Sequence, residues 1–297
     1  MPLHPNARGA ALMTAAMAGF AVSDACMKGL SAHWPLFQSI LLRGLGTTVL
    51  LGGLAMALGQ LRPVGRRDGG LILLRSLCEM AAGWCYLSAI GVMPLANVSA
   101  IQQAVPLTVT LAGALVLGER FGWRRMAAIL VGLGGVLLIV QPGGEGFTWA
   151  SVLVLGSVAA TTVRDLVSRM LSPEVPSLLA ATAASLGMVV LGGAGAAFVD
   201  WRPVSPASAA LLLGTVAFVL VGYVGSVSAM RVGEIAAVTP FRYTALVIAM
   251  ALGVLFFGDV PNALTLAGAA VVVATGVFTL LRGRRRPRPE EEASPGA

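Results

Sequence analysis

Ten long stretches of apolar residues, separated by short polar or charged connections, follow one another along the chain. A helix that crosses about 30 Å of hydrocarbon needs roughly 20 apolar residues, and each stretch comes close to that length. The pattern therefore predicts ten transmembrane helices. Their approximate limits are Arg8 to Met27, Pro35 to Leu58, Gly69 to Val92, Leu95 to Leu117, Trp123 to Val140, Ala150 to Leu171, Pro176 to Val199, Pro206 to Met230, Ile235 to Phe257 and Ala263 to Leu281.

The connections between these stretches are too short for a water-soluble domain. Composition agrees, since 57% of the residues are hydrophobic and 11% are charged, whereas soluble domains carry about 25% charged residues. Only residues 283–297, which are rich in Arg, Pro and Glu, are predicted to be disordered; they form a cytoplasmic tail in this scheme. We therefore predict an all-α integral membrane protein that is embedded in a lipid bilayer.

Positive charge along the chain gives the orientation of the spans. The net charge is +7, but the basic residues are scattered between apolar stretches, which argues against a nucleic-acid partner. Cytoplasmic connections retain an excess of Lys and Arg. With the N-terminus inside, 14 of the 20 Lys and Arg lie on the inner side, and only Lys28 and Arg202 lie on the outer side. We expect both termini to face the cytoplasm, in the plasma membrane (inner membrane) of a bacterium.

A sequence repeat relates the two halves of the chain. Matching pairs at an offset of 140 residues are Ser88 and Ser228, Gly113 and Gly253, and Gly118 and Gly258, and an offset of 141 pairs Asp24 with Asp165. The predicted halves are residues 1–141 and residues 142–282, with five spans each. Because five is odd, the second half enters the membrane from the opposite side. The pattern predicts two inverted five-helix repeats, an arrangement with a site at the membrane midplane.

The fourth and fifth spans carry the most specific motifs. Pro106 lies within the fourth span, Gly118-Glu119-Arg120 closes it, and the fifth span is rich in Gly. The second half repeats this pattern, except that Leu246 stands in the position of Pro106 and Asp259-Val260 replaces Glu-Arg. The chain resembles the drug/metabolite transporter superfamily, EamA type, over all ten spans. The resemblance implies a ten-helix basket with a central cavity, and relatives that export amino acids and related metabolites.

Charged residues at membrane depth are costly, so each is a candidate for function. Three pairs with i,i+4 spacing have a structural explanation as ion pairs, namely Asp24 with Lys28, Arg75 with Glu79, and Asp165 with Arg169. Arg43 and Arg242 have no acidic residue three or four positions away. Either Glu79 pairs with Arg242 or Arg43 across the bundle, or one of these two guanidinium groups receives an anionic group of the substrate, such as an amino-acid carboxylate.

Polar and aromatic residues deep in the spans form a second group of candidates. Gln102 and Gln103 precede Pro106 by about one turn, and a proline there frees the backbone carbonyl of Gln102, which indicates a broken helix beside a cavity. Pro240 is close to Arg242 in the other half. Both prolines are either passive kinks or hinges for alternating access. The aromatic candidates, which either line a pocket or pack between helices, are Trp84, Tyr86, Tyr223 and Tyr243.

These features predict a secondary transporter that moves small, mostly neutral metabolites by alternating access around a midplane cavity. Its predicted activity is export of amino acids with aromatic or aliphatic side chains. The predicted substrate-binding residues are Glu79, Trp84, Tyr86, Gln102, Gln103, Tyr223, Arg242 and Tyr243, and the hinge residues are Pro106 and Pro240. The alternative is an uptake carrier for a larger metabolite such as S-adenosylmethionine or riboflavin, because residues 240–243 (PFRY) resemble a segment of such carriers.

The sequence holds no recognisable catalytic motif, nucleotide-binding loop or cluster of metal ligands. We therefore expect no enzymatic activity, no catalytic residues, no metal and no cofactor. The expected partners are a small-molecule substrate and the lipid bilayer. Because the doubled bundle is complete in one chain, we expect a monomer.

Overall fold

A computed structural model describes residues 4–118, 122–142 and 148–282, and in these ranges all regular structure is helical. Ten helical segments are long and apolar enough to cross a membrane, as predicted. The predicted tail and Glu119-Arg120 lie outside the described residues. The elements are α1 (Pro5–Ser31), α2 (Leu36–Ala57), α3 (Arg66–Ile90), α4 (Leu95–Gln102), α5 (Val105–Leu117), α6 (Trp123–Val140), α7 (Trp149–Arg169), α8 (Ser177–Ala196), α9 (Pro206–Val232), α10 (Ile235–Val238), the 3-10 helix η1 (Thr239–Tyr243), α11 (Thr244–Phe257) and α12 (Ala263–Arg282).

Local sequence signals set the ends of several helices. Pro206 is the first residue of α9, and the Ser205 hydroxyl accepts a hydrogen bond from the backbone N–H of Ser208 in a capping box. At the other type of end, α5 and α11 stop at Gly118 (φ 68°) and Gly258 (φ 67°). This left-handed conformation favours glycine, which has no Cβ. The two stops are equivalent under the 140-residue repeat.

The fourth and ninth spans are both interrupted. In the fourth, Gln103 and Ala104 separate α4 from α5, and Pro106 is the second residue of α5. The predicted break before Pro106 is therefore confirmed. In the ninth span the backbone tightens into η1, which contains Pro240, before it continues as α11. A 3-10 segment replaces the i to i−4 hydrogen bonds of an α-helix with i to i−3 bonds. The fourth span and the ninth span are therefore both irregular, one in each half.

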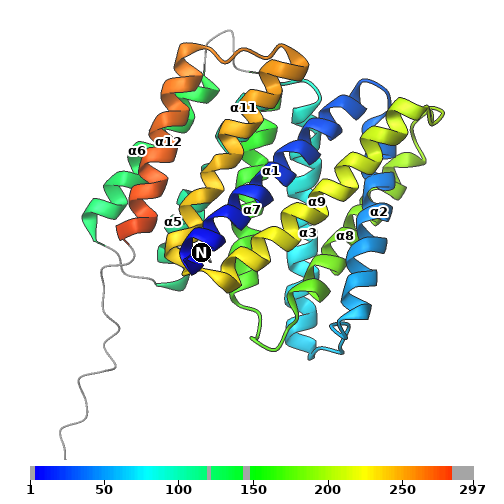
Figure 1. Cartoon of the computed structure of the whole chain (residues 1–297), viewed down its shortest axis with the longest axis horizontal. Helices are drawn as coiled ribbons and strands as arrows, with labels where there is room; N and C mark the ends of the chain where they lie inside the picture. Colours follow the sequence, from blue (N-terminus) through cyan, green and yellow to red (C-terminus); the bar gives the residue numbers. More distant parts are fainter. Residues whose placement is uncertain (1–3, 119–121, 143–147, 283–297) are drawn as a thin grey trace, which may run out of the picture.

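The helices pack in pairs that join the two halves. The extensive contacts include α1 with α9, α3 with α7, α2 with α8, α6 with α12, α3 with α8, α5 with α7, and α1 with α11 (Figure 1). Exchanging the first five spans for the last five turns α1–α9 into α7–α3 and α5–α7 into α11–α1, while α2–α8 and α6–α12 map onto themselves. The packing pattern thus has the two-fold relation that an inverted repeat requires.

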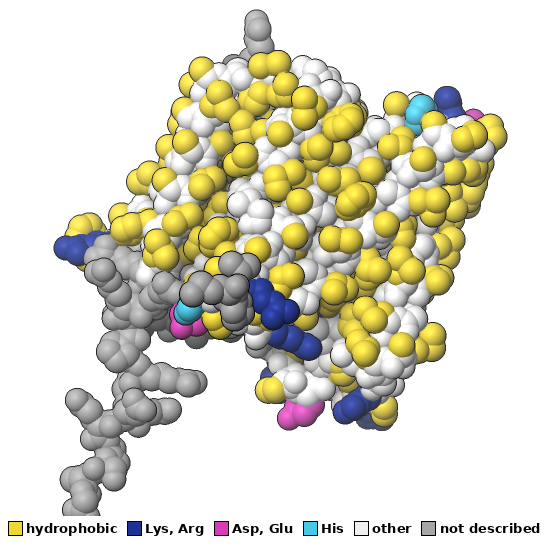
Figure 2. Space-filling view, in the orientation of Figure 1, with side chains coloured by type: hydrophobic (Ala, Val, Ile, Leu, Met, Phe, Trp, Pro, Cys, Tyr) yellow, Lys and Arg dark blue, Asp and Glu magenta, His cyan; other side chains and the backbone are white. Residues whose placement is uncertain are grey.

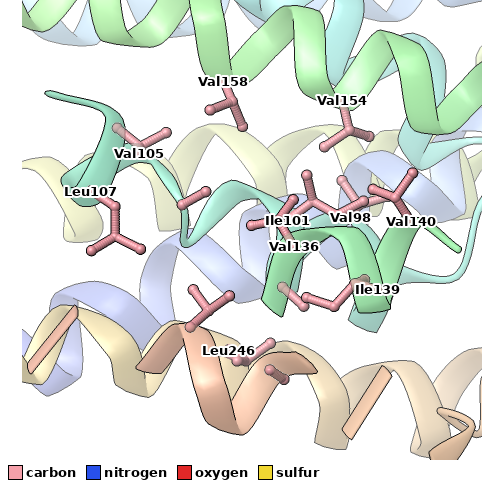
Figure 3. Close-up of a cluster of buried hydrophobic side chains, with 14 of the residues drawn as sticks. Val98, Ile101, Val105, Leu107, Val136, Ile139, Val140, Val154, Val158 and Leu246 are labelled. Atoms are coloured by element: carbon pink, nitrogen blue, oxygen red, sulfur yellow. The ribbon is translucent and has the colours of Figure 1, made fainter. Parts of the chain in front are cut away.

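A large apolar cluster joins the broken fourth span to its neighbours. Figure 3 shows Val98 and Ile101 of this span between Val154 of α7 and Val136 of α6, and Leu107 further along the span in the same cluster. All five side chains are buried, with at most 4% of their surface exposed. This side of the bundle is closely packed. The cavity lies on the other side, where side chains of α1, α2, α3, α8 and α9 contribute to its lining.

The face of the bundle shown in Figure 2 is apolar along most of its height, and charged side chains gather towards its two ends. Exposed apolar side chains include Val49, Leu115, Phe198 and Leu213. A surface of this kind suits contact with lipid chains. The start of α1 and the end of α12 lie at the same end of the bundle (Figure 1), which we name the terminal end; the other is the distal end.

Candidate functional site

A cavity of about 670 Å³ lies between the two halves, and its volume falls within the usual range for small-molecule sites, about 300–1,000 Å³. Side chains of α1, α2, α3, α7, α8, α9 and η1 line it. The polar and charged lining residues are Arg43, Thr47, Arg75, Glu79, Arg164, Ser177, Ser185, Tyr223, Ser226, Arg231 and Arg242. The apolar ones include Met13, Met17, Phe20, Ile40, Leu87, Met188, Val216 and Met230.

The cavity opens towards the terminal end. There the lining includes Ser177, the first residue of α8, and Met230 and Arg231 in the last turn of α9, all of which are exposed. Towards the distal end the lining includes Ile40 and Leu87, which are 1% and 3% exposed. The structure therefore represents a state that is accessible from the terminal end and closed at the distal end.

An ion pair that joins the two halves closes the distal end. The Lys28 ammonium group, near the end of α1, lies 3.1 Å from Oδ2 of Asp259, which follows α11. The same ammonium donates a hydrogen bond to the backbone carbonyl of Met93 (2.7 Å) and lies 5.3 Å from the ring centroid of Phe257. Oδ2 of Asp259 also accepts a hydrogen bond from the backbone N–H of Leu95 (3.0 Å). We name this group the distal latch. The predicted pairing of Lys28 with Asp24 is wrong, because Lys28 turns towards Asp259.

A second polar contact seals the distal end beside α2. Nε2 of Gln38 donates to the backbone carbonyl of Arg202 (2.8 Å), and the backbone N–H of Arg202 donates to Oε1 of Gln38 (2.9 Å). Because Gln38 is fully buried and both ends of its amide are used, the contact holds the α8–α9 connection against α2.

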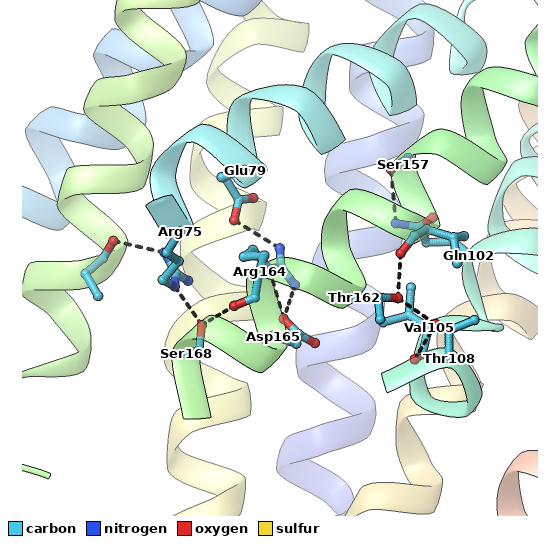
Figure 4. A network of polar contacts seen from close by, with 12 residues as sticks. Arg75, Glu79, Gln102, Val105, Thr108, Ser157, Thr162, Arg164, Asp165 and Ser168 are labelled. Atoms are coloured by element: carbon cyan, nitrogen blue, oxygen red, sulfur yellow. Dashed lines mark hydrogen bonds and ion pairs between the residues drawn. The ribbon is translucent and has the colours of Figure 1, made fainter. Parts of the chain in front are cut away.

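Halfway down the cavity, one guanidinium group bridges two carboxylates. Arg164 of α7 donates to Oε2 of Glu79 on α3 (3.0 Å) and to Oδ1 of its neighbour Asp165 (2.8 Å). Arg75 instead donates to the Ser168 hydroxyl (3.0 Å) and to the backbone carbonyl of Ala180 (3.0 Å) (Figure 4). The predicted ion pair between Arg75 and Glu79 is therefore wrong. The Arg164 side chain thus turns into the bundle, towards α3.

Nearer the distal end, Arg43 of α2 enters the cavity. Among the described residues, its guanidinium group makes one long hydrogen bond of 3.5 Å, from Nη2 to the Ser23 hydroxyl. Asp24, next along α1, accepts a hydrogen bond from the Tyr86 hydroxyl at 2.8 Å. The carboxylate of Asp24 is close enough to Arg43 for an electrostatic interaction. The buried carboxylate thus has a phenol donor and a nearby positive charge in place of the lysine that the sequence suggested.

The structure brings three of the predicted substrate-binding residues together at the cavity and places five elsewhere. Glu79, Tyr223 and Arg242 line it, and the Tyr223 hydroxyl donates to the backbone carbonyl of Ser177 (2.9 Å). The other five lie outside the lining. Trp84 is 39% exposed on the surface of α3, and the Tyr86 hydroxyl donates a hydrogen bond to Asp24. Gln102 donates to the Ser157 hydroxyl of α7 (3.4 Å), Gln103 lies at the α4–α5 break, and Tyr243 is buried against Gly276.

Several lining residues were not among the predicted site residues. Four are methionines, whose flexible thioether side chains suit adaptable apolar surfaces: Met13, Met17, Met188 and Met230. Thr47 and Ser185 add hydroxyl groups from α2 and α8. Among the charged lining residues, Arg43 and Arg75 could have been predicted from the sequence, because both lie deep within their spans.

Comparisons with known proteins agree with this architecture. A family model described as the EamA-like transporter family matches residues 7–141. The pseudopaline exporter CntI of Pseudomonas aeruginosa is 29% identical over 275 residues, which cover 89% of this chain and 93% of that protein. A riboflavin transporter of Vibrio cholerae is 26% identical over 291 residues, with 93% of each chain covered. A protein of Streptantibioticus cattleyicolor named "Probable terminal-alkyne amino-acid exporter" is 29% identical over 264 residues, 84% of this chain and 86% of that one.

A solved structure also shares the fold. It covers 95% of this chain and 100% of its own, with a TM-score of 0.62 and 18% sequence identity. Ten apolar spans around a central cavity, together with relatives that are named transporters across most of their length, define a multi-pass membrane transporter. Within that class, residues 7–141 match the EamA-like transporter family, and the similarity to named exporters over most of the chain supports an EamA-type transporter of the drug/metabolite superfamily. Its relatives differ in the molecules that their names record, so the family alone leaves the substrate open.

Proposed function

We propose that this chain exports amino acids or closely related metabolites across a bacterial inner membrane by alternating access. The observation that carries the proposal is the cavity between the halves, which combines guanidinium groups with apolar walls. A guanidinium group binds a carboxylate through two parallel hydrogen bonds. Met13, Met17 and Phe20 provide an apolar surface for an aliphatic or aromatic side chain.

The direction of transport follows from the orientation proposed for the membrane. The excess of Lys and Arg in the connections at the terminal end supports a cytoplasmic location for that end. The cavity that opens there would load its substrate from the cytoplasm. Export then requires the distal latch to separate while the terminal end closes, with the irregular segments around Pro106 and Pro240 as hinges.

The amino-acid relative supports this substrate class, whereas the riboflavin transporter supports the alternative of a larger metabolite. The cavity favours the first, because its charged groups suit carboxylates. We propose that the working unit is a monomer, since the cavity is bounded by helices of a single chain.

Counterflow in proteoliposomes tests the proposal. Vesicles with purified protein are loaded with an unlabelled amino acid, the same labelled amino acid is added outside, and uptake is followed without an ion gradient. Transient accumulation above that in protein-free vesicles is the expected result for at least one amino acid. Accumulation of riboflavin, with none for any amino acid, would replace the proposal by its alternative.

A further inference from the structure

Of the five guanidinium groups that line the cavity, that of Arg164 forms ion pairs with carboxylates, and the other four form none of at most 4.0 Å in the described part of the chain. The ion pairs of Arg164 are with Glu79 and Asp165, and Arg75 donates instead to the Ser168 hydroxyl and to the backbone carbonyl of Ala180. Arg43 and Arg242 are also among these four lining groups. Arg43 lies towards the distal end and Arg242, in η1, towards the mouth, so the two groups come from different parts of the cavity wall.

The whole lining has an excess of positive charge. It includes five guanidinium groups, from Arg43, Arg75, Arg164, Arg231 and Arg242, and one carboxylate, from Glu79. Two further carboxylates lie just behind the wall, where Asp165 contacts Arg164 and Asp24 is close to Arg43. Even when both are included, the cavity has two more positive than negative side chains.

Unpaired charge at membrane depth is unfavourable, because a low-dielectric surrounding disfavours a charged group that has no counter-charge. Arg231 avoids this cost, since it lies in the last turn of α9, where its side chain can reach the interface. Arg43 lies seven residues inside α2, so its side chain is further from the membrane interface than that of Arg231. An anionic substrate would supply the missing counter-charge and use N–H donors that the protein leaves largely free.

We propose that the cavity selects amino-acid-type substrates with a net negative charge and at least two carboxylates, one received by Arg43 and one by Arg242. The inference rests on the proposed function and narrows its substrate class from amino acids and closely related metabolites in general to the acidic ones among them. A substrate amino group has a single carboxylate in the lining to bind, Glu79, whose Oε2 already accepts from Arg164. Carboxylates therefore outnumber amino groups in the molecule that fits.

Two pairs of amino acids that differ only by one acid group test this selection. L-glutamate is compared with L-glutamine, and L-aspartate with L-asparagine, as competitors of counterflow and as ligands that raise the melting temperature of the purified protein. We expect each acid to act at a concentration about tenfold or more below that of its amide, as a lost charge-assisted bidentate contact implies.

Matched variants assign the preference to the two residues. Arg43→Gln and Arg242→Gln should each reduce the acid-to-amide preference to about threefold or less, whereas Arg43→Lys and Arg242→Lys should retain more of it because they keep the charge. Arg67→Gln, exposed at the start of α3 and outside the cavity, is the control and should leave the preference unchanged. Size-exclusion profiles confirm that each variant is folded.

The outcomes separate this inference from the proposed function. If amides are transported as well as acids or better, or if both Gln variants keep the full preference, the selection for anions is refuted while amino-acid transport stands. If no amino acid produces counterflow or a change in melting temperature, both proposals fail together.

Discussion

Breaking the distal latch should shift the transporter towards a state that is open at the distal end. The perturbation is Asp259→Asn, which removes the negative charge but keeps a side-chain oxygen for the backbone N–H of Leu95. Lys28 then loses its counter-charge at 3.1 Å and retains the carbonyl of Met93. The latch joins α1, the α3–α4 turn and the second residue after α11, so its loss weakens the contact between the halves at this end.

The size of the shift follows from the burial of the pair. The side chains of Lys28 and Asp259 are 12% and 17% exposed, so water screens them less than a surface pair. Hydrogen bonds to charged groups contribute about 1.5–3 kcal/mol to stability. Because the bonds to the carbonyl of Met93 and from the N–H of Leu95 remain, we expect Asp259→Asn to destabilise the closed state by about 1.5–2 kcal/mol, near the lower limit. That free energy changes the ratio of open to closed molecules by about 10–30-fold.

Thiol labelling measures this ratio. Ile90, the last residue of α3, is 1% exposed, packs in one apolar cluster with Leu30 and Leu95 and is outside the cavity, so a cysteine there reacts only when the distal end opens. In a background where Cys26, Cys78 and Cys85 are alanine, a membrane-impermeant maleimide should label Ile90→Cys about 10–30 times faster with Asp259→Asn than without it.

The matched control is Asp68→Asn at the terminal end, where Oδ1 of Asp68 accepts from the backbone N–H (3.2 Å) and hydroxyl (3.1 Å) of Ser172. This change should not accelerate labelling of Ile90→Cys. Equal labelling rates with and without Asp259→Asn, in protein that remains folded, would refute the assignment of the latch as a closing contact. Equal acceleration by both substitutions would show general loosening of the bundle instead.

Two further predictions concern stability. Tyr86→Phe should lower the free energy of unfolding by about 1.5–3 kcal/mol, because the buried carboxylate of Asp24 loses its phenol donor at 2.8 Å; thermal unfolding in detergent measures this, and an unchanged melting temperature contradicts it. Gly268→Ala should cost about 1–3 kcal/mol, since its Cβ would lie 2.5 Å from the backbone carbonyl oxygen of Gly135 where α6 and α12 cross, whereas Gly134→Ala, with nothing within 4 Å, should cause no loss in the same assay.

The spans and their interruptions were predictable from the sequence because they depend on local properties. Length and hydropathy set the ten spans, and Pro106 marks the break that the structure places at Gln103 and Ala104. The orientation of side chains around each helix was not predictable in the same way. In a span that is apolar on every side, no polar face indicates which side meets lipid, so Trp84 was expected in a pocket and lies on the surface.

The charged pairs were not predictable because their partners come from other helices. Lys28 and Asp259 are 231 residues apart in the sequence, and Arg164 and Glu79 are 85 apart. Spacing within one helix suggested Asp24 for Lys28 and Arg75 for Glu79, since i,i+4 neighbours can always meet. In both cases contact between the halves provides a different partner, which only the packing of α1, α3, α7 and α11 decides.

The repeat relates the helices of the two halves but not the charges of the cavity. α2 and α8 both begin after a proline, Pro35 and Pro176, and this register places Ala184 in the position of Arg43. The register set by the glycines that end α5 and α11 places Gln102 in the position of Arg242. The symmetric fold therefore has no need of either guanidinium group. Positions that line the cavity, carry a charge and depart from the repeat are where substrate-specific chemistry is expected, and Arg43 and Arg242 meet all three conditions.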